Sequence, residues 1–148
     1  MSADAAAAVR EEDAFDVAAV TEWLRESAID ASGIADEPIV KQFTGGASNL
    51  TYQLSYPSGR NLILRRPPSG TKARGAHDMG REFRIQQALA PVFPLVPRMV
   101  GHCLDDAVIG SEFYVMDRID GVILRKDIPV GIGLDESATV DRLCDNAI

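Results

Sequence analysis

A short glycine-rich stretch near position 45 holds the residue types best suited to binding an anion. Gly45 and Gly46 can adopt backbone dihedral angles that are closed to other residues, so their N–H groups can approach an anion closely. Ser48 and Asn49 follow and add side-chain hydrogen-bond donors. Arg65, at the end of an apolar run, adds a permanent positive charge. Free N–H groups beside a cation suit a polyphosphate, although an ordinary hairpin with a glycine bulge would give the same local pattern.

Basic residues are concentrated in the part of the chain that contains this glycine-rich stretch. The whole chain has a net charge of −7, but residues 41–101 carry nine Lys or Arg against two acidic residues. The flanking residues, 1–40 and 102–148, are both strongly acidic. Cations gathered around such a loop in an acidic protein suit a small bound anion better than a nucleic acid, for which we would expect a basic domain overall. Chance clustering on a solvated face is the alternative.

The length and composition predict one globular domain that does not enter a membrane. At 148 residues the chain is long enough for a single core, and its 46% apolar and 25% charged residues are ordinary for such a domain. It has no apolar run of about 18 residues, the length of a membrane span. Its N-terminus lacks the basic start and apolar core of a secretion signal. Because Cys103 and Cys144 are too few for a disulfide framework or a metal site, we expect a cytoplasmic protein.

Helices and strands are predicted on both sides of the glycine-rich stretch. Asp16 can cap a helix that runs to about Ala28, and Trp23 is the side chain best able to dock this helix on a sheet. Residues 76–89 predict a second helix. Period-two alternation and apolar runs between turn residues predict five strands. They lie at residues 39–43, 50–55, 62–65, 98–103 and 113–116, with a turn over 104–107.

A carboxylate lies on the apolar side of the second predicted helix. Glu82, Ile85 and Leu89 are spaced at i, i+3 and i+7, which places them on one face. A buried carboxylate is costly without a partner, and Arg65 is the natural cation for it. We therefore expect Arg65 and Glu82 to lie within about 4 Å of each other. The alternative is that Glu82 lies at the edge of the apolar stripe and reaches water.

Four stretches of the sequence carry a resemblance to a known family, and they occur in the family's order. They are Phe43–Asn49, Leu62–Pro68, Arg81–Ile85 and Phe113–Asp117. Together they resemble the aminoglycoside phosphotransferase-like family, and within it the kinase-like domains associated with acyl-CoA dehydrogenases. The resemblance covers about residues 39–125. It implies an α+β protein-kinase-like N-lobe: a five-stranded antiparallel sheet with one helix after the third strand, an N-terminal helix and a truncated C-terminal helical segment.

We expect three parts along the chain. We expect residues 1–15 to be a disordered leader and residues 16–121 to be the nucleotide-binding N-lobe. Residues 122–148 would be the exit from the hinge and the start of a second lobe.

The implied ligand is ATP, and its phosphates would lie at the glycine-rich stretch. Arg65 stands where such folds usually place a lysine that holds the α- and β-phosphates, and Glu82 would be its helix partner. An arginine at this position keeps the charge and can fork across two oxygen atoms. Ser48 would lie near the β-phosphate. The loop over the phosphates would be formed by Gly45, Gly46, Ala47, Ser48 and Asn49.

The resemblance places the adenine at the end of the last strand. Met116 would abut the base, and the backbones of Asp117 and Ile119 would hydrogen-bond its edge. Magnesium is expected only where the second lobe of the fold is present, because that lobe supplies the metal ligands.

We identify no catalytic residue in this chain. Phosphoryl transfer in this fold needs a catalytic aspartate, a nearby asparagine and a metal-binding aspartate, all from the second lobe. His102 and Asp105 superficially resemble a catalytic-loop fragment, but they precede the Phe113 strand and lack the asparagine at catalytic spacing. Because about 27 residues follow Gly121, we expect the front half of an enzyme, inactive by itself. Residues 122–148 would then fold back on the sheet or mediate self-association.

The expected function is that of the ATP-binding lobe of a small-molecule O-phosphotransferase, which moves the γ-phosphoryl group of ATP to a hydroxyl. The acceptor would be a hydroxyacyl-CoA, with an aminoglycoside or a choline-like alcohol as the other possibility. The alternative is a non-catalytic binding or interaction module derived from a kinase-like lobe. Measured ATP affinity separates the two, because a purely structural module would show none.

Overall fold

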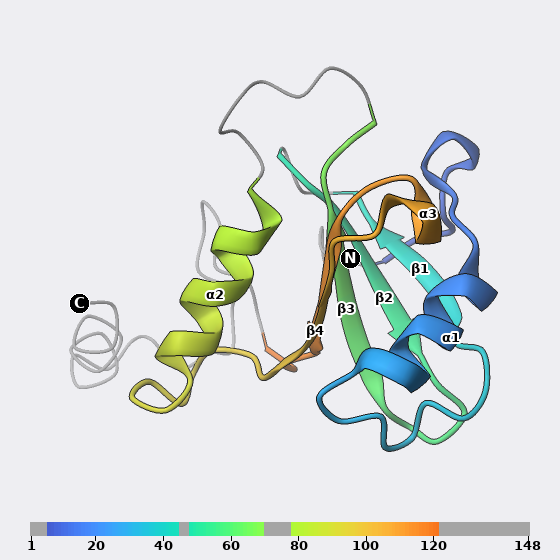
Figure 1. Ribbon diagram of the computed structural model, residues 1–148. Helices are drawn as coiled ribbons and strands as arrows, with labels where there is room; N and C mark the ends of the chain where they lie inside the picture. Colours follow the sequence, from blue (N-terminus) through green and yellow to red (C-terminus); the bar gives the residue numbers. More distant parts are fainter. Residues whose placement is uncertain (1–5, 45–47, 70–77, 122–148) are drawn as a thin grey trace, which may run out of the picture.

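A five-stranded antiparallel sheet runs through the middle of the molecule (Figure 1). The computed structural model describes residues 6–44, 48–69 and 78–121. The strands are β1 Ile39–Phe43, β2 Leu50–Ser55, β3 Asn61–Arg66, β4 Met99–Cys103 and β5 Phe113–Asp117. Their order in the sheet is β1-β2-β3-β5-β4, so β5 is an inner strand, as its continuous apolar run predicted. All five predicted strands are confirmed, with bounds that differ by one residue at most.

Two helices pack on opposite faces of this sheet (Figure 1). They are α1 Val17–Ser27 and α2 Met79–Leu89. The predicted cap of α1 is confirmed, because Asp16 Oδ1 accepts a hydrogen bond from the Ala19 N–H at 3.0 Å. Asp78 caps α2 in the same way through the Arg81 N–H at 2.7 Å. The predicted start of the second helix, at residues 76–77, lies outside the described residues. No helix in the described part of the chain is long and apolar enough to cross a membrane.

The main core lies between the sheet and α1. Alternate residues of β2 and β3 point to this face, and α1 contributes Val20 and Leu24. Trp23 docks the helix as predicted: its ring meets Phe113 edge to face at a centroid distance of 5.0 Å. The ring also covers Gly101, where an added Cβ would lie 2.8 Å from Trp23 Cη2. The sheet residues of this core are Tyr52, Leu54, Leu62, Leu64, Val100, Cys103, Phe113 and Val115.

A smaller core lies under α2, and it corrects the predicted face of that helix. Met79 and Phe83 are the large side chains that α2 buries, whereas Ile85 is 52% exposed and Leu89 is 39% exposed. The prediction that Ile85 and Leu89 share the buried face is therefore wrong. Met79 and Phe83 are one helical turn apart and pack on Met99 and Tyr114 of the sheet, and Glu82 borders that same face. The aromatic contacts of Phe83 decide which side of the helix is covered.

Of the disordered leader expected over residues 1–15, residues 1–5 lie outside the described residues, and residues 6–15 are held against the sheet. Ala7 forms an isolated antiparallel bridge to Gln42 of β1, with both backbone hydrogen bonds at 2.8 Å. A short 3-10 helix, η1 Glu11–Asp13, follows. Asp13 is buried, and its carboxylate accepts from Gln42 Nε2 at 2.8 Å. This polar segment is held by backbone pairing at a sheet edge and by hydrogen bonds to buried side chains, which composition does not reveal.

Arg66 holds the same segment from inside the molecule. Its guanidinium donates to the Asp13 carbonyl at 2.8 Å and to the Tyr52 hydroxyl at 3.2 Å. It lies over the rings of Phe15 and Tyr52, 5.6 Å and 5.5 Å from their centroids. Only 6% of Arg66 is exposed, so this arginine belongs to the core.

The residues after β4 form a helical turn where the sequence predicted a simple turn. Asp105 accepts from the Ala107 N–H at 2.9 Å and caps α3 Asp106–Ile109. Gly110 ends α3 with a φ of 82°, a left-handed conformation that favours glycine.

Candidate functional site

Arg65 and Glu82 meet between the sheet and α2. Because side chains alternate along β3, Leu64 and Arg66 point to the α1 face and Arg65 points to the α2 face. Arg65 Nη1 lies 3.0 Å from Glu82 Oε2, which confirms the predicted ion pair. The side chains are 29% and 31% exposed, so water still reaches both. Glu82 therefore has the predicted partner, although it also lies at the edge of the buried face and reaches water, as in the alternative.

Tyr114 completes this pair, and sequence reasoning missed it. It lies directly across from Arg65 in the β3–β5 register. Its hydroxyl donates to Glu82 Oε2 at 3.0 Å and accepts from Arg65 Nη1 at 3.1 Å. Burial raises the pKa of Tyr114, so the hydroxyl remains a donor at neutral pH. Only the strand register reveals this contact, because the two residues are 49 positions apart.

Asn49 ties the start of β2 to the same carboxylate. Its Nδ2 donates to Glu82 Oε1 at 3.0 Å, so both oxygens of Glu82 are engaged. Asn49 is 7% exposed, whereas its neighbour Ser48 is exposed. The other predicted loop residues, Gly45, Gly46 and Ala47, lie outside the described residues.

The residues predicted to meet the adenine lie at the end of β5, and they do not all face the same way. Met116 is half-buried and packs with the α2-side core, on the face that carries Arg65. Asp117 points to the other face, where its carboxylate pairs with Arg60 and Arg98. Its N–H donates to the Arg98 carbonyl at 2.9 Å. Ile119 is 56% exposed.

His102 takes part in packing. Its ring stacks on Phe83 at a centroid distance of 5.3 Å, and its Nε2 lies 3.8 Å from Glu112 Oε2. Asp105, its supposed partner in a catalytic-loop fragment, caps α3 instead. Within residues 6–44, 48–69 and 78–121, no cluster of three or more His, Cys, Asp or Glu side chains could hold a metal ion.

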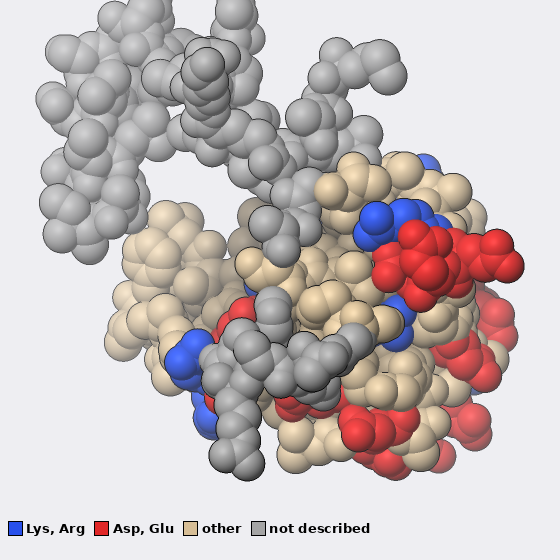
Figure 2. All heavy atoms as spheres, turned by 90° about the horizontal axis from the view of Figure 1, so that it is seen from above, with Lys and Arg blue, Asp and Glu red and all other residues tan. Residues whose placement is uncertain are grey.

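Acidic side chains are gathered away from the Arg65 site. Figure 2 shows most of the visible carboxylates on the side of the molecule where Figure 1 places α1 and η1. The exposed glutamates of η1 and α1 are Glu11, Glu12, Glu22 and Glu26. These exposed carboxylates come from the acidic residues 1–40, and α1 lies on the face of the sheet opposite Arg65.

The comparison with known proteins supports the same family. A model of the "Phosphotransferase enzyme family" matches residues 39–148. Acyl-CoA dehydrogenase family member 10 from Mus musculus is 43% identical over 84 residues, which are 57% of this chain and 8% of that protein. Acyl-CoA dehydrogenase family member 11 from Homo sapiens is 38% identical over 86 residues, which are 58% of this chain and 11% of that protein.

A solved structure gives the fold. A protein from Ralstonia eutropha, provisionally assigned as an aminoglycoside phosphotransferase, is 32% identical with a TM-score of 0.64. The likeness covers 80% of this chain and 32% of that one, and it confirms the kinase-like N-lobe expected from the sequence. This chain spans 8% to 13% of the length of its curated relatives. Because the family model matches well over half of the chain, the chain belongs to the phosphotransferase enzyme family.

Proposed function

We propose that this chain binds ATP as the nucleotide-binding lobe of a small-molecule O-phosphotransferase. The observation that carries the proposal is the Arg65–Glu82 ion pair at 3.0 Å, joined by Tyr114 on β5 and by Asn49 at the start of β2. A cation held by a helix carboxylate on the strand after a glycine-rich loop suits the phosphates of a nucleotide.

Arg65 has donors left for a phosphate. Its contacts to Glu82 and Tyr114 both use Nη1, and in the described part of the chain Nη2 and Nε have no partner. A guanidinium can offer two such donors to two oxygen atoms at once. In this proposal Glu82 and Tyr114 fix one edge of Arg65, and the other edge holds the α- and β-phosphates.

The remaining predicted residues take supporting roles in the proposal. Ser48 and the loop Gly45–Ala47 would cover the phosphates, with Ser48 near the β-phosphate. Met116 would abut the adenine. Because the Asp117 N–H is bonded to Arg98, we assign the Asp117 carbonyl and the Ile119 backbone to the adenine edge.

The proposed acceptor is a hydroxyacyl-CoA. Its support is indirect: two relatives carry the name acyl-CoA dehydrogenase over a length far greater than this chain. The solved relative is instead described as an aminoglycoside phosphotransferase, so an aminoglycoside-like alcohol is the second acceptor class.

Calorimetric titration of the purified chain with ATP tests the nucleotide proposal. We expect measurable binding that weakens about 10- to 100-fold in Arg65→Ala, since a hydrogen bond to a charged group contributes about 1.5–3 kcal/mol. Arg81→Ala is the matched control, because Arg81 is exposed and its side chain has no partner in the described part of the chain. Failure of the wild-type chain to bind millimolar ATP, or equal binding by Arg65→Ala, would contradict the proposal and favour the non-catalytic module.

A further inference from the structure

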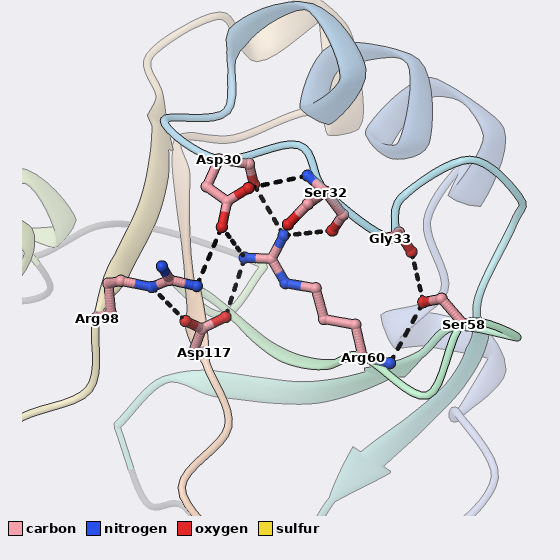
Figure 3. A network of polar contacts seen from close by, with 7 residues as sticks. All are labelled: Asp30, Ser32, Gly33, Ser58, Arg60, Arg98 and Asp117. Atoms are coloured by element: carbon pink, nitrogen blue, oxygen red, sulfur yellow. Dashed lines mark hydrogen bonds and ion pairs between the residues drawn. The ribbon is translucent and has the colours of Figure 1, made fainter.

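Four charged side chains form a closed ring at the end of β5 (Figure 3). Asp117 Oδ1 lies 3.1 Å from Arg60 Nη2, and Asp117 Oδ2 lies 2.7 Å from Arg98 Nε. Asp30 Oδ2 closes the ring, 3.1 Å from Arg98 Nη2 and 3.7 Å from Arg60 Nη2. We call Asp30, Arg60, Arg98 and Asp117 the charge ring. Its signs alternate, so each charge has two opposite neighbours.

The charge ring joins segments that are far apart in the sequence. Asp30 lies in the connector between α1 and β1, Arg60 directly before β3, Arg98 directly before β4, and Asp117 is the last residue of β5. Figure 3 shows the side chains converging from these separate segments onto one point. The position of the β5 end is therefore fixed by parts of the fold that lie outside the Arg65 site.

Arg60 is the centre of this arrangement. Its Nη1 also donates to the Asp30 carbonyl at 2.9 Å and to the Ser32 carbonyl at 2.6 Å. Its side chain is 14% exposed, against 64% for Arg98, so its contact with Asp117 is the better shielded of the two. Arg60 thus clamps the connector and the β5 end to each other.

The connector that carries Asp30 is itself held in place. The Ser58 hydroxyl donates to the Gly33 carbonyl at 2.7 Å, and Gly33 has a φ of 73°, which favours glycine (Figure 3). The Ser32 N–H donates to Asp30 Oδ1 at 2.9 Å, and hydrogen bonding from Ser32 lowers the pKa of the Asp30 carboxyl. The carboxylate therefore remains charged at neutral pH.

The backbone at the end of β5 is held on both sides. The Asp117 N–H donates to the Arg98 carbonyl at 2.9 Å, and the Arg118 N–H donates to the Asn61 carbonyl at 3.1 Å. Both carboxylate oxygens of Asp117 are occupied by arginines. These contacts set the direction in which the chain leaves β5 toward Ile119.

From this geometry we infer that the charge ring positions the end of β5 for the nucleotide base, with Asp117 as a positioning residue whose carboxylate does not touch the ligand. The inference rests on the proposed ATP binding. It assigns base recognition to the ring and phosphate binding to Arg65, so the two contributions can be separated.

Calorimetric titration with two ligands separates base recognition from phosphate binding. ATP carries the base, and inorganic tripolyphosphate does not. We expect Arg60→Met to weaken ATP binding at least tenfold and to leave tripolyphosphate binding within about twofold of the wild type, which also reports that the lobe is folded. Arg81→Met is the matched control for loss of charge and should bind both ligands as the wild type does.

Asp117→Asn provides a second variant of nearly unchanged shape. It removes the charge and keeps one of the two acceptor oxygens, so one arginine retains a hydrogen bond. We expect a loss of ATP affinity, again without a loss of tripolyphosphate affinity. Wild-type ATP affinity in Arg60→Met, or an equal loss for both ligands, would overturn the inference while leaving ATP binding by the wild type established. A wild-type chain that binds neither ligand would overturn the proposed function, and this inference with it.

Discussion

Replacing Glu82 by alanine removes an acceptor that three side chains share. Asn49 at the edge of β2, Arg65 on β3 and Tyr114 on β5 each donate to this carboxylate at 3.0 Å. The substitution leaves the α2 backbone intact, because alanine favours a helix. Its effect on the free energy of unfolding therefore measures what these contacts contribute.

The magnitude follows from burial. The ion pair is about 30% exposed on both sides, and such a pair contributes about 0.2–1 kcal/mol. The hydrogen bond from Asn49 adds about 0.5–1.5 kcal/mol. Tyr114 is fully buried, and the loss of its acceptor costs about 1 kcal/mol or more. We expect Glu82→Ala to lower the free energy of unfolding by about 2–3 kcal/mol, which corresponds to about 5–10 °C in melting temperature.

Urea denaturation followed by circular dichroism measures this change, with Glu22→Ala as the matched control. Glu22 is an exposed glutamate on α1 without a partner in the described part of the chain, so its removal should change stability by less than about 0.5 kcal/mol. If Glu82→Ala and Glu22→Ala unfold at the same urea concentration, the contacts of Glu82 contribute nothing to the free energy of unfolding and our reasoning is refuted. A double-mutant cycle with Arg65→Ala should give a coupling of about 0.2–1 kcal/mol.

Two further predictions concern the core. Gly101→Ala should destabilise the protein by about 1–3 kcal/mol, because its Cβ would lie 2.8 Å from Trp23. Gly121→Ala is the control, because its Cβ would meet nothing within 4 Å in the described part of the chain. Equal unfolding midpoints for both variants would show that the Trp23 ring moves aside at no cost. The buried Tyr56 hydroxyl has no hydrogen-bond partner in the described residues, and burial raises its pKa to about 12. In the unfolded chain Tyr56 ionises near pH 10, whereas in the folded protein it stays protonated up to about pH 12. The free energy of unfolding of the wild type should therefore fall between pH 10 and 12 by about 2–3 kcal/mol more than that of Tyr56→Phe. Urea midpoints that change in parallel for both proteins across this range would contradict the raised pKa.

Much of the fold could be predicted because its signals are local. The period-two pattern of β2, the apolar run of β5 and the cap at Asp16 each depend on a few neighbouring residues. The Arg65–Glu82 pair was also predicted, because a carboxylate that faces the sheet needs a cation. The stripe of Ile85 and Leu89 used to place Glu82 is exposed, however, and Glu82 instead borders the face of Met79 and Phe83. The structure confirms both the elements and the pair.

The wrong predictions concern the buried face of α2 and the expected leader, and both depend on contacts between residues far apart in the sequence. Ile85 and Leu89 match a helical stripe as well as Met79 and Phe83 do, and the sheet selected the second pair because Phe83 packs against Tyr114 and His102. The polar residues of the expected leader gave no sign of order, because their partners lie on β1 and β3.

The sequence by itself determined which segments become strands and helices, where the cations gather, and which family the chain resembles, since these properties reside in residue types and short spacings. The sequence also predicted that Arg65 reaches Glu82, but only the tertiary structure decided that the adjacent Arg66 enters the opposite core. It also decided that Tyr114 joins the pair and that Asp117 belongs to the charge ring. The physical reason is that alternation along a strand fixes only that neighbouring side chains point to opposite faces. Strand order and register decide which helix covers which face and which residue lies across the sheet. Both are properties of the folded chain as a whole.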